Sequence, residues 1–83
     1  RTRYLRLSDV ECFRAEGNYI RVYIGGEQHL VRLSMTRLER MLDPRRFARI
    51  HRSSIVRVDC IHELLASGQG DYVVVMKSGE RLD

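Results

Sequence analysis

The most informative segment of this chain is Pro44-Arg45-Arg46-Phe47-Ala48-Arg49-Ile50-His51-Arg52-Ser53-Ser54-Ile55-Val56-Arg57-Val58. It contains five arginines and no acidic residue, so its charge of about +5 exceeds the +4 of the whole 83-residue sequence. The rest of the chain is therefore nearly neutral. A positive patch of this density attracts polyanions, of which nucleic acid is the most common. Charge alone is equally compatible with arginines on an ordinary solvated face.

Short β-strands are predicted on both sides of this segment, because turn residues recur every 8–12 residues or so. Residues 19–24 alternate most cleanly, with Ile20, Val22 and Ile24 on one face. Glycine turns at Gly17-Asn18 and Gly25-Gly26 bound this strand. Further strands are expected at 4–7, 10–15, 28–33, 50–51, 55–58, 72–76 and 80–82, with a kink at 53–54; residues 60–65 fit a strand or a helix.

One short α-helix is expected at about residues 34–42. Ser34 is a suitable N-cap, and Met35, Leu38 and Leu42 follow at helical spacing. Pro44 ends the helix, because the residue before a proline avoids the helical conformation. The apolar face should close one end of a sheet core. The fold class predicted from pattern is therefore mainly β with one helix.

Length and composition indicate one small domain. No apolar run approaches the roughly 20 residues of a membrane span, and no signal peptide opens the chain. The chain starts without methionine, so we expect a piece of a longer protein. Its basic residues are fourteen arginines and one lysine, a bias that suits bidentate contacts to phosphate or guanine but could also reflect codon usage.

Two cysteines, Cys12 and Cys60, occur without a secretory signal. This usage is typical of a reducing compartment, so we expect a cytoplasmic location. Both cysteines lie at strand-like positions, and we expect small core residues there and no disulfide.

Sites for metals or catalysis are poorly supported. Cys60 and His62 are the closest potential metal ligands, but zinc-type spacing is missing. Cys60 or Ser53 beside His51 could form a nucleophile pair, yet no nucleophile elbow or phosphate-binding glycine loop is present. We therefore expect no enzyme activity, no metal, no cofactor and no small-molecule substrate.

Among nucleic-acid binders, two common designs are disfavoured. A helix-turn-helix protein needs a second helix for recognition. An RNA-binding sheet of the RRM type needs an aromatic and glycine run that is missing here. A β-rich scaffold that presents polar loops to DNA remains.

Four segments, in order, resemble the LytTR family of bacterial DNA-binding domains: Glu16-Gly17-Asn18-Tyr19-Ile20, then Leu33-Ser34-Met35-Thr36-Arg37-Leu38-Glu39, then Leu42-Asp43-Pro44-Arg45-Arg46-Phe47-Ala48-Arg49-Ile50-His51-Arg52-Ser53, and finally the Ser78-Gly79 turn. The third is the most specific. The resemblance implies an elongated set of small antiparallel sheets with one or two short helices. It also implies that loops enter successive grooves of double-stranded DNA.

The family's contact loops map onto the Gly17-Asn18 turn and the segment around Arg52-Ser53. A third contact motif would follow the last strand, beyond Asp83, and its loss would put full affinity in doubt. Residues 1–83 would thus form a single domain of a longer regulator. The resemblance further implies an N-terminal receiver or other input domain and dimerisation on paired sites. The operator cannot be read from the sequence.

The candidate DNA contacts are ranked by physical chemistry. Asn18 can offer its amide to a base edge, and Arg52 can enter a groove or bind phosphate; a turn residue and a surface arginine are the alternatives. His51 is expected to hydrogen-bond within the fold and orient Arg52. Further phosphate candidates are Arg49 and Ser53, followed by Arg45, Arg46 and Arg57. Phe47 and Ile50 are expected in the core.

A second hypothesis is a β-rich interaction module that binds an acidic protein or its own copy. Its anchors would be exposed tyrosines, namely Tyr4, Tyr19 and Tyr23. Non-specific RNA binding is a weaker third option.

Overall fold

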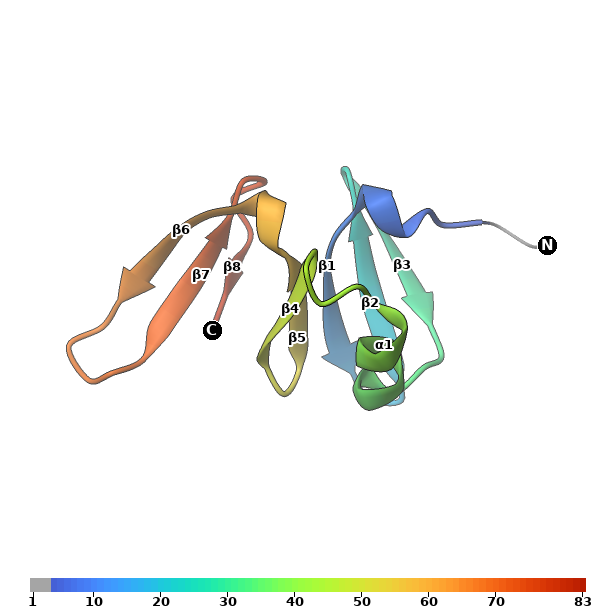
Figure 1. The fold of residues 1–83 in the computed structure, drawn as a ribbon, viewed down its shortest axis with the longest axis horizontal. Helices are drawn as coiled ribbons and strands as arrows, with labels where there is room; N and C mark the ends of the chain where they lie inside the picture. Colours follow the sequence, from blue (N-terminus) through green and yellow to red (C-terminus); the bar gives the residue numbers. More distant parts are fainter. Residues whose placement is uncertain (1–3) are drawn as a thin grey trace.

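Residues 4–83 are described by a computed structural model. The molecule is elongated, with extents of 47 × 23 × 22 Å, and is built from two antiparallel sheets with one α-helix (Figure 1). The first sheet contains β1 (Val10–Glu16), β2 (Tyr19–Ile24), β3 (Glu27–Val31), β4 (Phe47–His51) and β5 (Ser54–Arg57). The second contains β6 (Ile61–Ala66), β7 (Tyr72–Met76) and β8 (Arg81–Leu82), and α1 spans Met35–Met41. The expected fold class is confirmed.

The central pairing of the larger sheet joins strands that are distant in sequence. Its order is β3-β2-β1-β5-β4, so the β4–β5 hairpin adds to β1 after the chain has passed through α1. Cys12 lies opposite Val56, and Phe13 lies opposite Ile55. These four side chains are all at most 2% exposed, so both faces of the central strands are covered.

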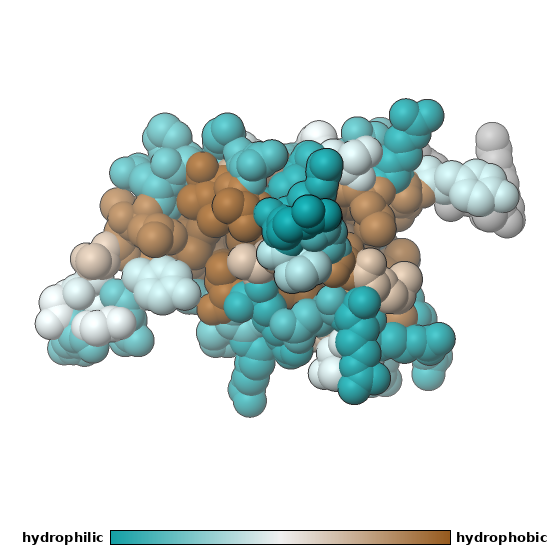
Figure 2. Space-filling model, viewed as in Figure 1, coloured by the Kyte–Doolittle hydropathy of each residue, from teal (hydrophilic) through white to brown (hydrophobic). Residues whose placement is uncertain are grey.

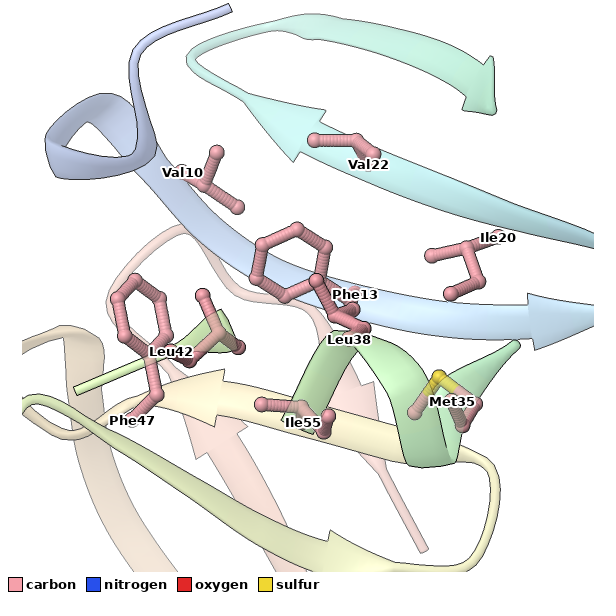
Figure 3. Packing of buried hydrophobic residues seen from close by; sticks show 9 residues of the cluster. All are labelled: Val10, Phe13, Ile20, Val22, Met35, Leu38, Leu42, Phe47 and Ile55. Carbon is pink, nitrogen blue, oxygen red and sulfur yellow. The ribbon is translucent and has the colours of Figure 1, made fainter. Parts of the chain in front are cut away.

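The first core lies between this sheet and α1 (Figure 3). Val10 and Phe13 both belong to it although they are three residues apart. A β-bulge explains this, because the register with β2 shifts between Val10 and Cys12 and leaves Glu11 as the extra residue. The buried members of this core are Val10, Phe13, Ile20, Val22, Met35, Leu38, Leu42, Phe47 and Ile55.

The helix begins and ends as the sequence predicts. The Ser34 Oγ accepts a hydrogen bond of 3.1 Å from the Arg37 N–H, which caps the first turn. Met35, Leu38 and Leu42 are all at most 8% exposed and pack on the sheet. Their expected role in the core is confirmed.

The second core lies on the other face, between the two sheets. Cys12 and Val56 contact Val74, Met76 and Leu82 there. Beside this core, Arg14 of β1 forms an ion pair of 2.9 Å with Glu80, which precedes β8. Apolar packing and this ion pair therefore link the two sheets.

Three predictions about local structure were wrong. Residues 4–7 form no strand, because Asp9 donates its N–H to the Arg6 carbonyl and closes a 3₁₀ turn at Leu7–Asp9. Val58 belongs to a 3₁₀ turn, Val58–Cys60, that redirects the chain between the sheets. Cys60 lies in that turn, half-buried, and not in a strand.

Two further positions differ from expectation. The break near Ser53 is a hairpin turn at Arg52-Ser53, and Ser54 already begins β5 with a buried side chain. Tyr23 lies opposite Cys12 on the neighbouring strand and packs half-buried against the second core, so it is not an exposed anchor. Residues 60–65, left open by the sequence, lie mainly in β6.

Substitution of Leu38 tests the first core. Leu38→Ala should lower the free energy of unfolding by about 2–5 kcal/mol, because it leaves a cavity between helix and sheet. Met41→Ala, in the same helix but 60% exposed, should change it by less than about 0.5 kcal/mol. Urea denaturation measures both, and equal effects would contradict this packing.

The thiol of Cys12 should be protected. Burial, followed by the charge of Glu80, raises the pKa of Cys12 from 9.0 to about 12. In native protein a thiol reagent at pH 8 should modify Cys60 first and reach Cys12 only on unfolding. Cys12→Ala should leave the fast phase of labelling unchanged; the disappearance of that phase would refute the assignment of Cys60 to it.

The raised pKa of Cys12 also affects stability. Because the pKa is raised on folding, the associated stability is complete below pH 9 and is lost as the pH rises toward 12.

Candidate nucleic-acid interface

Two tight turns lie side by side at one end of the larger sheet. Gly17-Asn18 joins β1 to β2, and Arg52-Ser53 joins β4 to β5. The Ala15 N–H donates to the Ser53 carbonyl over 2.8 Å, so the central pairing continues to the base of both turns. Both turns face the lower edge in Figure 1.

The Asn18 turn is shaped by a glycine. Gly17 has a φ of +61°, a conformation that costs other residues energy. Asn18 is exposed, and its side chain makes no hydrogen bond within residues 4–83. Beside it, Arg21 donates to both carboxylate oxygens of Glu16, at 2.6 and 3.3 Å, and this hydrogen bonding raises the pKa of Arg21. The acidic residue next to the turn is thereby paired.

The Arg52 turn is held from within. The Nδ1 of His51 lies 2.8 Å from the Ser53 Oγ and accepts from the Ser53 N–H over 3.3 Å. The expectation that His51 hydrogen-bonds within the fold is confirmed. The side chain of Arg52 is exposed and has no partner in the described part of the chain. The Arg52 guanidinium is therefore unpaired within residues 4–83 and belongs to a turn that internal hydrogen bonds hold in place.

Arg49 occupies a different environment. One of its terminal nitrogens donates to Glu39 of α1 over 3.1 Å, and the other donates to the Arg52 carbonyl over 2.6 Å. Its side chain is only 24% exposed. The guanidinium is thus engaged by the protein on two sides.

The remaining arginines of the segment lie at the other end of the β4–β5 hairpin. Arg46 directly precedes β4, and Arg57 ends β5 opposite Phe47. A strand of five residues separates them from the Arg52 turn by about 16 Å. Arg57 is half-buried, whereas Arg45 is 90% exposed but pairs with Asp43 at 3.3 Å.

Two acidic residues were missed as parts of this site. Asp43 accepts from the Arg45 N–H over 2.9 Å and lies 3.9 Å from Arg46, a local arrangement that its position before Pro44 could have indicated. Glu39 reaches Arg49 across ten positions of sequence, and no local pattern signals that pair. The acid-free segment is therefore partly neutralised by acids just outside it.

Figure 2 shows hydrophilic side chains along both the upper and the lower edge of the molecule, and an apolar area toward the smaller sheet. Within residues 4–83, no group of three His, Cys, Asp or Glu side chains could hold a metal ion. The helix described there is too short and polar to cross a membrane.

Both the sequence and the fold of this chain match a known family of domains. The model of the LytTR DNA-binding domain family matches residues 1–83. The chain belongs to the LytTR family. A solved LytTR DNA-binding domain, assigned to a methyl-accepting/DNA response regulator from Bacillus cereus, is 26% identical and superposes with a TM-score of 0.86. The match covers 94% of this chain and 72% of that one.

Membership of the LytTR family makes this a DNA-binding domain of the kind used in transcription regulation, and not a member of an enzyme family. The motifs that carry the resemblance now have places in the fold. The first forms the β1–β2 turn, the second forms α1, and the third runs from the end of α1 to the Arg52-Ser53 turn.

The ion pair at Asp43 gives a pH-dependent prediction. The Arg45 N–H and then the Arg45 side chain hold the pKa of Asp43 below 3.8. Because the folded-state pKa is lowered, the associated stability is present above about pH 4 and is lost as the pH falls further. An NMR titration of the Asp43 carboxyl group should give a pKa below 3.8. Arg45→Ala should raise it only in part, since the backbone bond remains; an unchanged pKa would exclude the side chain as a cause.

Proposed function

We propose that this LytTR domain reads specific sequences of double-stranded DNA through its two adjacent turns, as the output domain of a bacterial transcriptional regulator. The observation that carries the proposal is the exposed, unpaired side chain of Arg52 on a turn held by His51 and Ser53. Since phosphate contacts position a protein and base contacts specify sequence, a fixed turn with a free guanidinium is suited to base readout.

The second turn supplies the other proposed base contact. The two hairpins are neighbours in one sheet, so their midlines are about 10 Å apart. One duplex can therefore contact both turns at once. Asn18, whose amide is free, would then hydrogen-bond a base edge while Arg52 reads another.

The other candidates take supporting roles in this proposal. Ser53 acts on the turn, because its N–H donates to His51 Nδ1 and its hydroxyl lies 2.8 Å from the same nitrogen. Arg45, Arg46 and Arg57, at the far end of the hairpin, contribute general attraction to phosphates and carry no sequence information. Arg49 is engaged with Glu39 and the Arg52 carbonyl, so it acts on the turn itself.

The wider context is also a proposal. The related Bacillus cereus domain is assigned to a response regulator. By analogy, we place this domain in a cytoplasmic two-component regulator with an N-terminal receiver and dimerisation on repeated sites. A third contact beyond Asp83 would add affinity.

The test is Arg52→Ala on a duplex selected by this domain from a randomised pool. Loss of a base contact should weaken binding by about 1–3 kcal/mol, or roughly 5- to 150-fold, and relax preference at one position. Fluorescence anisotropy over a salt series measures both effects. Arg45→Ala is the matched control and should weaken all duplexes slightly and alike.

Unchanged affinity and preference in Arg52→Ala would remove Arg52 from the interface. Asn18→Ala should relax preference at a different position of the selected site, because the second turn meets other base pairs. If both variants lost preference at the same position, the two-turn geometry would be wrong.

A further inference from the structure

We propose that Glu39 and Arg49 are positioning residues that fix the Arg52-Ser53 turn for base readout. The inference rests on the proposed function, since it concerns how that turn is presented to DNA. It assigns to Arg49 a role through another residue, in place of its own contact with phosphate.

The geometry of the guanidinium carries the inference. One terminal nitrogen is 3.1 Å from Glu39 Oε1 and the other is 2.6 Å from the Arg52 carbonyl. The Nε is buried and has no hydrogen-bond partner in the described part of the chain. Of the five guanidinium N–H groups, two make these bonds and the Nε–H is buried, so two remain for an external phosphate.

The strand ahead of the turn explains why such a brace is useful. The register between β4 and β5 shifts between Arg49 and His51, so a bulge at Ile50 interrupts the ladder just before the turn. Bulges redirect side chains and weaken regular pairing. The hydrogen bond from Arg49 to the Arg52 carbonyl spans the bulge. It holds the turn at a point where regular backbone pairing between the strands is interrupted.

The other end of the brace, the Glu39 side chain, is 52% exposed but belongs to a helix that packs on the core. Glu39 follows Leu38, which is 3% exposed and packs in the first core with Phe47 and Ile55. Packing on the core therefore holds the helix in place. The Glu39 carboxylate then restrains the turn through its hydrogen bond with Arg49. Functional groups need this kind of support to stay within a productive geometry.

Two substitutions of Glu39 separate this role from simple electrostatics. Glu39→Ala and Glu39→Gln both remove one negative charge, which alone should strengthen binding to DNA equally. Glutamine keeps an oxygen that accepts from Arg49, whereas alanine does not. We expect Glu39→Ala to weaken binding to the selected duplex about fivefold, and Glu39→Gln to bind more tightly than Glu39→Ala.

Arg49→Lys completes the test. Lysine retains the charge, so a phosphate contact would survive with an unchanged salt dependence. Lysine lacks the two terminal nitrogens with which Arg49 bonds Glu39 and the Arg52 carbonyl at once. We therefore expect weaker discrimination between the selected duplex and a duplex that differs from it by one base pair. Glu63→Ala, an exposed charge removal on β6, is the matched control and should not weaken binding.

The measurements are anisotropy on both duplexes, thermal unfolding, and the amide NMR shifts of Arg52 and Ser53. Shifted turn amides and reduced discrimination with an unchanged unfolding midpoint support the brace. Tighter binding by Glu39→Ala, or intact discrimination by Arg49→Lys, would overturn it. Arg52→Ala is measured alongside, because its failure to affect binding would refute the proposed function instead.

Discussion

Strand β1 pairs with β5 at the centre of the larger sheet, and both cores and both turns are built around this pairing. At its centre, Cys12 lies opposite Val56 and Phe13 lies opposite Ile55, and all four side chains are buried. Consecutive residues of a strand point to opposite faces, so this pairing must be covered on both sides. The helix covers one face and the smaller sheet covers the other. A small chain thereby obtains two cores from one pair of strands.

The same pairing assembles the proposed DNA-binding surface. Where β1 ends and β5 begins, the chain turns twice, and the two turns become neighbours although more than 30 positions separate Asn18 from Arg52. Tertiary contacts then divide the arginines of this segment into paired and unpaired ones. Glu39 engages Arg49, and Asp43 engages Arg45 and Arg46, while the Arg52 side chain has no partner among residues 4–83. The proposed surface therefore differs from a uniformly basic patch, because acidic residues pair with part of its positive charge.

Much of the fold could be predicted because its signals are local. Ser34 with the spacing of Met35, Leu38 and Leu42 marked the helix, and Gly17 and Gly25 marked the tight turns. The incorrect predictions concern residues whose structure depends on contacts with residues distant in the sequence. The alternation of residues 4–7 is too short to choose a strand over a turn. The exposure of Tyr23 could not be known before the second sheet was placed against its face.

Periodicity, capping and turn chemistry act over a few neighbouring residues, so the mainly β class, the helix, the resemblance to LytTR domains and the identity of the candidate contacts follow from sequence alone. The folded chain was needed to show which arginines are paired, that both turns share one edge, and that Glu39 reaches the Arg52 turn through Arg49. These relations arise from the β1–β5 pairing and from packing of α1 on the sheet, and no local pattern of residues encodes contacts of that kind.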